Sequence, residues 1–154
     1  MKSILPVACA FVLTLVAHES LADATHHKLV APADMKWSDV PSLPRGAKAA
    51  VIEGPLNQAV PFTVRLRFPA NYRIPPHWHP AVERVTVLSG TFHMGMGDKP
   101  DMQTSMAVTA GSVMLLPAKS SHYAWTEGEV EVQLHGTGPW GITYVDAADD
   151  PRKN

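Results

Sequence analysis

The sequence predicts an all-β fold, a sandwich or a jelly roll, on three observations. Fourteen prolines and ten glycines divide the 154 residues into short segments, as expected of many strands joined by turns. Several of these segments alternate apolar and polar residues, which is the pattern of a strand with one buried face. No segment after residue 24 carries the apolar stripe of an amphipathic helix. We therefore expect eight to ten short strands.

The composition fits one globular domain. Hydrophobic residues make up 45% of the chain, and the net charge of −1 argues against a nucleic-acid or membrane-surface partner held by charge. The only cysteine, Cys9, lies near the N-terminus. If that segment is removed, the protein has no disulfide and no cysteine-ligated metal.

Residues 1–24 have the features of a secretory signal peptide. Lys2 precedes an apolar run at 4–17 that is too short to span a bilayer comfortably. Cleavage after Ala22 or Ala24 fits the small-x-small rule. An uncleaved anchor is the alternative. We expect cleavage, no membrane anchor afterwards, and a secreted or periplasmic protein.

The next segments are expected to be strands at the edge of a sheet. Residues 25–50 should form an N-terminal arm with edge strands, and 60–68 alternate between an apolar and a polar set. The apolar set should face the core and the two arginines water. The alternative places Arg65 or Arg67 in a substrate pocket, where it would bind a carboxylate.

A stretch at 75–90 carries the clearest chemical signal. Because side chains alternate along a strand, His77 and His79 share a face. Pro75-Pro76 should precede the strand, and Glu83 joins the histidines if the strand continues past Pro80. Two imidazoles and a carboxylate on one face can hold a divalent metal, although histidines on a solvated face are the simpler alternative.

A second stretch, 111–122, reads as turn, buried strand, turn, and then His122 at the start of a new strand. Together the two stretches resemble the cupin family. The family motif G-x5-H-x-H-x3,4-E-x6-G is matched by His77, His79, Glu83 and Gly90, and G-x5-P-x-G-x2-H-x3-N is matched by Gly111, Pro117 and His122.

Three positions depart from these motifs. Asn71 and Lys119 stand where glycines are expected, and Thr126 replaces the final Asn. Asn tolerates left-handed backbone geometry, whereas Lys does not favour it. We therefore expect the turn before His122 to differ from the usual form of the family. Thr126 is not at a ligand position.

The resemblance implies a cupin-type jelly roll, also called a double-stranded β-helix barrel, here at 51–146, with a polar tail at 147–154. It also implies one divalent metal ion bound by three histidines and one glutamate: His77, His79, Glu83 and His122. Iron, manganese, nickel, copper and zinc all suit these ligands, and the sequence does not choose among them. Single-domain cupins often pair through their N-terminal strands, so a homodimer is expected.

Three further residues are candidates for acid–base or orienting roles beside the metal, namely Tyr123, Gln133 and His135. The alternative for Gln133 and His135 is the solvated face of their strand. Two classes of function follow from the resemblance. One is an oxygenase, isomerase or lyase acting on a small organic molecule, and the other is a non-catalytic module that binds or senses a metal or small ligand. A barrel whose metal only adds stability is a third reading.

Overall fold

The computed structural model describes residues 27–153, so the predicted signal peptide lies outside the described residues. Within this range the chain forms eleven strands and three short 3-10 helices. Among the described residues, no helix has the length and apolar character of a membrane span. The strands are β1 (Ser38–Asp39), β2 (Lys48–Glu53), β3 (Pro61–Phe68), β4 (Arg73–Trp78), β5 (Glu83–Ser89), β6 (Thr91–Met96), β7 (Met106–Thr109), β8 (Val113–Leu116), β9 (His122–Thr126), β10 (Val130–Thr137) and β11 (Thr143–Tyr144).

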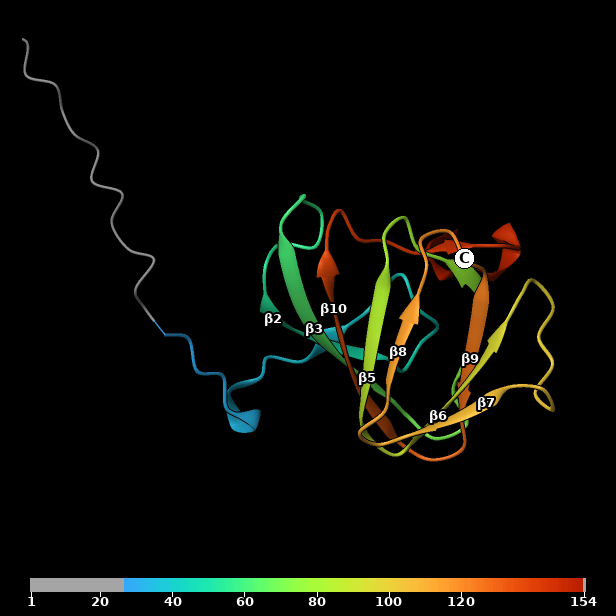
Figure 1. The fold of residues 1–154 in the computed structure, drawn as a ribbon, viewed down its shortest axis with the longest axis horizontal. Coiled ribbons are helices and arrows are strands. Elements are labelled where there is room, and N and C mark those ends of the chain that lie inside the picture. Colours follow the sequence, from blue (N-terminus) through green and yellow to red (C-terminus); the bar gives the residue numbers. More distant parts are fainter. Residues whose placement is uncertain (1–26, 154) are drawn as a thin grey trace, which may run out of the picture.

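The strands form two antiparallel sheets that face each other, as Figure 1 shows. The six-stranded sheet has the order β1-β2-β3-β10-β5-β8, and the five-stranded sheet has the order β11-β4-β9-β6-β7. Consecutive strands repeatedly change sheets, which is the topology of a jelly roll. The predicted all-β jelly roll is therefore confirmed.

The core fills the space between the sheets. The six-stranded sheet contributes Val64, Val85 and Val132, and the five-stranded sheet contributes Phe92 and Met94, all at most 3% exposed. β3 and β10 pair over eight residues, which places their apolar positions on one face and their polar positions on the other. The alternation predicted for 60–68 is confirmed.

The prediction that one strand begins after Pro75-Pro76 and continues to Glu83 was wrong. Both prolines lie inside β4, which ends at Trp78, and Glu83 is the first residue of β5 in the opposite sheet. The prolines are tolerated because the pairing of β4 with β9 shifts register between Ile74 and His77. Proline has no N–H to donate, and such an irregularity removes the need for one. Glu83 therefore faces the histidines from the other layer.

The turn before His122 also differs from our expectation. Lys119 adopts the left-handed conformation, with φ of 61°, and Asn71 does the same with φ of 59°. The backbone N–H of Lys119 donates to the carbonyl of His79 at 2.8 Å. The backbone geometry that favours glycine is therefore kept, at a cost for lysine of about 1–2 kcal/mol.

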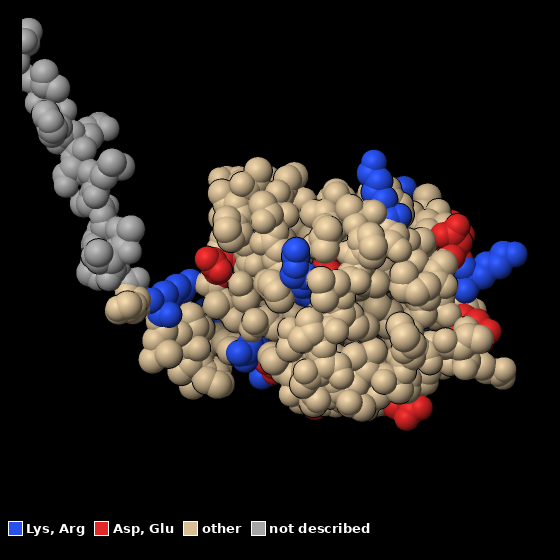
Figure 2. Space-filling view, in the orientation of Figure 1, with Lys and Arg blue, Asp and Glu red and all other residues tan. Residues whose placement is uncertain are grey.

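The two ends of the described chain pack against the barrel. In the N-terminal arm, the carbonyls of Ser42 and Pro44 accept hydrogen bonds from the hydroxyls of Tyr144 and Tyr72, respectively. The last strand, β11, has only two residues, and the segment predicted to be a polar tail forms two 3-10 turns, Ala147–Asp149 and Pro151–Lys153. Charges of both signs are interspersed over the face in Figure 2.

Candidate metal centre

The four predicted ligands come from three strands and one loop. His77 lies in β4, His122 opens β9 and Glu83 opens β5, while His79 follows the end of β4. His77 is paired with His122 across the two strands, which fixes their side chains on one face of the sheet. All four are buried, with exposed fractions between 2% and 7%.

The four side chains converge on one point inside the barrel. The ligand nitrogens of the three histidines lie within 4.8 Å of one another. Oε2 of Glu83 lies 3.2 Å from Nε2 of His122 and 3.5 Å from Nε2 of His79. Three nitrogens and one carboxylate oxygen at this spacing form a donor set that suits a divalent transition metal.

The backbone fixes which nitrogen of each imidazole faces that point. Nδ1–H of His77 donates to the Pro75 carbonyl at 2.7 Å, and Nδ1–H of His122 donates to the Ser120 carbonyl at 2.9 Å. Nδ1–H of His79 donates to the Gly141 carbonyl, also at 2.7 Å. Because a carbonyl only accepts, each Nδ1 carries a proton, which leaves Nε2 as the ring nitrogen that can present a lone pair to the centre.

Burial favours the neutral form of His77 and His79. It lowers the pKa of His77 well below its usual value, and the neighbouring His122 and His79 add to the effect. Burial also lowers the pKa of His79, against the opposing influence of Glu83. Neutral imidazole is the form that coordinates a metal.

Two polar atoms at the centre have no hydrogen-bond partner among the described residues. They are Nε2 of His79 and Oε2 of Glu83, and both are fully buried. Leaving such a group unpaired costs about 1–3 kcal/mol, and more for a charged one. Both atoms present lone pairs, so a shared cation would satisfy them together. The residues therefore fit a bound divalent metal.

The segment after β10 supports His79. The Trp140 ring stacks on the His79 ring, with centroids 4.2 Å apart, and it also contacts Phe62. The backbone N–H of Trp140 donates to the Leu56 carbonyl at 2.6 Å, which ties this segment to the loop between β2 and β3. The orientation of His79 therefore depends on Trp140 and Gly141.

A cavity of about 220 Å³ adjoins the four ligands. Apolar residues from both sheets line it, together with part of the N-terminal arm and the segment after β10. A small molecule in this cavity would lie beside the four predicted ligands.

Comparisons with known proteins place this geometry in a family. The family model described as "ChrR Cupin-like domain" matches residues 25–141, which is most of the chain. This chain belongs to the cupin family. A search of curated proteins by sequence finds no match.

Solved cupin-like structures share the fold at low identity. The polyketide cyclase RemF from Streptomyces resistomycificus has a TM-score of 0.68 and 19% identity, over 83% of this chain and 92% of that one. The DMSP lyase DddQ from Ruegeria pomeroyi has a TM-score of 0.59 and 17% identity, over 73% and 62%. The anti-sigma ChrR of Rhodobacter sphaeroides, solved in complex with SigE, has a TM-score of 0.51 and 18% identity, over 70% and 51%.

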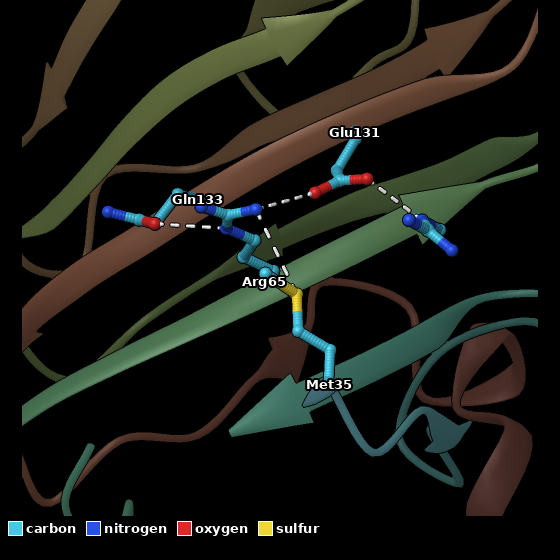
Figure 3. A network of polar contacts seen from close by, with 5 residues as sticks. Met35, Arg65, Glu131 and Gln133 are labelled. Atoms are coloured by element: carbon cyan, nitrogen blue, oxygen red, sulfur yellow. Dashed lines mark hydrogen bonds and ion pairs between the residues drawn. The ribbon is translucent and has the colours of Figure 1, made fainter. Parts of the chain in front are cut away.

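The structure places the other predicted site residues of this cupin away from the four predicted ligands. Along β10, Val132 and Leu134 line the cavity, so the intervening Gln133 and His135 lie on the opposite face of the sheet. In Figure 3, Gln133 accepts a hydrogen bond from Arg65 at 3.2 Å. Tyr123 is buried, but its hydroxyl donates to the Asp101 carbonyl and accepts from the Asp101 N–H.

The two arginines considered for a substrate pocket are also on this outer face. Arg65 and Arg67 both pair with Glu131, at 3.3 Å and 2.8 Å. Arg65 also donates to the sulfur of Met35, and Arg67 lies over the Trp37 ring at 4.0 Å. Neither arginine lines the cavity.

Sequence reasoning missed Trp140 and Gly141. It assigned neither residue a role beside the four predicted ligands. Gly141 and His79 are 62 positions apart, and no motif spacing connects them. The only local signal was an aromatic residue in a glycine- and proline-rich segment.

Proposed function

We propose that this cupin is a mononuclear metalloenzyme, an oxygenase, isomerase or lyase, acting on a small organic molecule beside a 3-His-1-Glu metal site. The observation that carries the proposal is the arrangement of the three imidazoles. Their Nδ1–H groups are all engaged by backbone carbonyls, and their Nε2 atoms converge with Glu83 at the edge of a cavity.

Such a metal would act as a Lewis acid, lower the pKa of bound water, or hold substrate and dioxygen together. The protein supplies the rest. Its backbone holds the imidazoles in one tautomer, and the apolar walls exclude water from the ligand. Glu83 is the only carboxylate that lines the cavity among the described residues, so it would supply the one oxygen ligand beside the three imidazoles.

The test begins with the untagged chain from Asp23 or Thr25. Its metal content is measured by mass spectrometry beside that of the His77→Ala/His79→Ala variant. We expect about one equivalent in the parent and little in the variant. The parent is then reconstituted with Fe(II), Mn(II), Ni(II), Cu(II) or Zn(II) and incubated with small aromatic and aliphatic compounds, with dioxygen uptake and product formation as readouts. Metal binding with no turnover in any combination would contradict an enzyme.

A binding or sensing role is the second candidate. It is favoured by the match to the ChrR cupin-like model and by the scarcity of acid–base groups in the cavity beyond the ligands themselves. This chain spans about half of the ChrR protein that was solved with its sigma factor. A metal-dependent change in partner binding without turnover would support this role.

Two further features belong to the proposal. We place the protein outside the cytoplasm, and N-terminal sequencing of the secreted material should begin at Asp23 or Thr25. We also propose a homodimer formed through the N-terminal strands. Sedimentation analysis should then give twice the mass of one chain, and a monomer at all concentrations would contradict it.

A further inference from the structure

The cavity beside the metal ligands is almost entirely hydrocarbon. Apart from the four ligands, its polar side-chain atoms are the hydroxyl of Ser42 and the indole N–H of Trp140. The other lining residues are apolar, and they include Phe68, Phe92 and Met94. No lysine or arginine lines it among the residues that the structure describes.

We propose that this cavity binds a small molecule with an uncharged hydrocarbon or aromatic body and a single oxygen function. The oxygen lies at the metal ligands and the body lies against the apolar walls. This inference rests on the proposed metal site for the position of the oxygen, whereas the apolar body is selected by the walls alone.

Charge is the first argument. Burying an ionised group in an apolar cavity without a partner costs several kcal/mol. A ligand with a charged group on its hydrocarbon or aromatic body would therefore bind weakly. The nearby arginines cannot offset this cost, because Arg65 and Arg67 lie on the outer face and pair with Glu131. Amino acids, dicarboxylates and phosphorylated sugars are therefore disfavoured.

Size is the second argument. The cavity of about 220 Å³ is smaller than the roughly 300–1,000 Å³ of pockets that hold drug-sized ligands. One wall is formed by Val40, Ser42 and Leu43 of the N-terminal arm, which is held to the barrel by the hydroxyls of Tyr72 and Tyr144. The ligand is therefore the size of one substituted ring or a short chain.

The entrance lies beside β2. Val51 lines the cavity and is 55% exposed, so it lies where the cavity meets solvent. A larger side chain at this position would narrow the entrance without overpacking the core. Val113 on β8 has the same exposed fraction and does not line the cavity, which makes it a matched control.

The experiment is calorimetric titration of the protein, metal-free and Zn(II)-loaded, with 4-ethylphenol, tyramine and 4-hydroxyphenylacetate. We expect 4-ethylphenol to bind both forms and to bind the Zn(II) form more tightly. The two probes that carry a charge on the side chain opposite the hydroxyl should bind at least about tenfold more weakly. Val51→Trp should weaken 4-ethylphenol binding at least about tenfold, whereas Val113→Trp should leave it unchanged.

The outcomes separate this inference from the metal proposal. If no metal binds but 4-ethylphenol still does, the metal site fails and the apolar pocket stands. Equal binding of the charged probes, no binding of 4-ethylphenol to a metal-loaded protein, or an equal effect of the two tryptophan variants would overturn the inference. Ala49→Phe, at a second lining position, repeats the blocking test if Val51→Trp does not fold.

Discussion

Two clusters of polar side chains lie on opposite faces of this barrel. The outer cluster consists of Arg65, Arg67, Glu131 and Gln133, and each charged group in it has a partner of opposite charge (Figure 3). The inner cluster consists of His77, His79, Glu83 and His122. Burial lowers the pKa of His77 and His79, and two buried atoms of this cluster have no hydrogen-bond partner among the described residues.

The difference shows what each cluster does. The outer cluster is complete within the protein and joins β3, β10 and the N-terminal arm, so it contributes to stability. The inner cluster raises the free energy of the metal-free fold, because lone pairs face each other without a donor. Such a cost is typical of a site whose remaining partner is a ligand. Changes to the two clusters should therefore have separable effects.

The largest effect is expected for His122→Ala. Loss of this nitrogen should remove most of the bound metal, and with it the stabilisation that metal gives to the folded state. At a metal concentration of about a thousand times Kd, that stabilisation is about 4 kcal/mol. Thermal unfolding with and without Zn(II) measures it. An identical metal-induced rise in Tm in the variant and the parent would show that His122 is not a ligand.

Trp140→Leu should weaken metal binding about 10- to 100-fold, the usual effect of losing a group that orients a metal ligand. The Trp140 ring stacks on His79, and its loss frees that imidazole to rotate. Competition with a chromophoric chelator gives the affinity. The control is Trp37→Leu, which removes the aromatic ring that lies under Arg67 of the outer cluster and should leave the metal affinity unchanged.

Arg65→Met should lower the stability of the fold without changing metal affinity. It removes hydrogen bonds to Gln133 and Glu131 in a partly buried setting, at a cost of about 1–2 kcal/mol in the free energy of unfolding. Metal affinity should not change. Urea denaturation and chelator competition measure the two quantities, and a large loss of metal affinity would mean that the clusters are coupled.

The metal-free protein should lose stability as the pH falls below about 6.5. The pKa of His77 is depressed in the folded state by burial, so the unfolded chain binds more protons in this window. Stability is therefore fully present above the unfolded pKa and declines toward the lower folded pKa. Urea midpoints across pH 5–8 test this slope, and in His77→Phe the slope should be shallower.

The smallest effect is expected for Lys119→Gly, a gain of up to about 1 kcal/mol. Glycine relieves the left-handed strain at φ of 61°, and its greater entropy in the unfolded chain offsets part of the gain. The N–H that bonds His79 is kept, so metal affinity should not fall. Differential scanning calorimetry measures the gain; a decrease in Tm would indicate that the lysine side chain stabilises this turn.

The sequence was sufficient to predict the fold and the four converging residues, because both predictions rest on local sequence patterns. Strand alternation predicted the apolar face of β3, and motif spacing predicted His77, His79, Glu83 and His122. The patterns did not decide which face of β10 lies inside the barrel. Alternation along a strand shows that Gln133 and His135 lie on the face opposite Val132 and Leu134, but it does not show which of the two faces points inward.

Other features depend on tertiary contacts that no local pattern encodes. Because β4 ends at Trp78, Glu83 reaches the histidines from a strand of the opposite sheet. The alternation of side chains along one strand could not predict this. The contact between Gly141 and His79 joins distant parts of the chain. The left-handed turn at Lys119 persists against the preference of its residue, because its N–H is bonded to the His79 carbonyl.

The central claim is that the inner cluster is a metal site, and metal content by mass spectrometry tests it most directly. The untagged parent, Arg65→Met and His77→Ala/His79→Ala would be purified side by side. The account predicts about one equivalent of a transition metal in the parent and in Arg65→Met, and little in the double variant. No metal in the parent after reconstitution with each candidate ion, or equal metal in all three proteins, would contradict it.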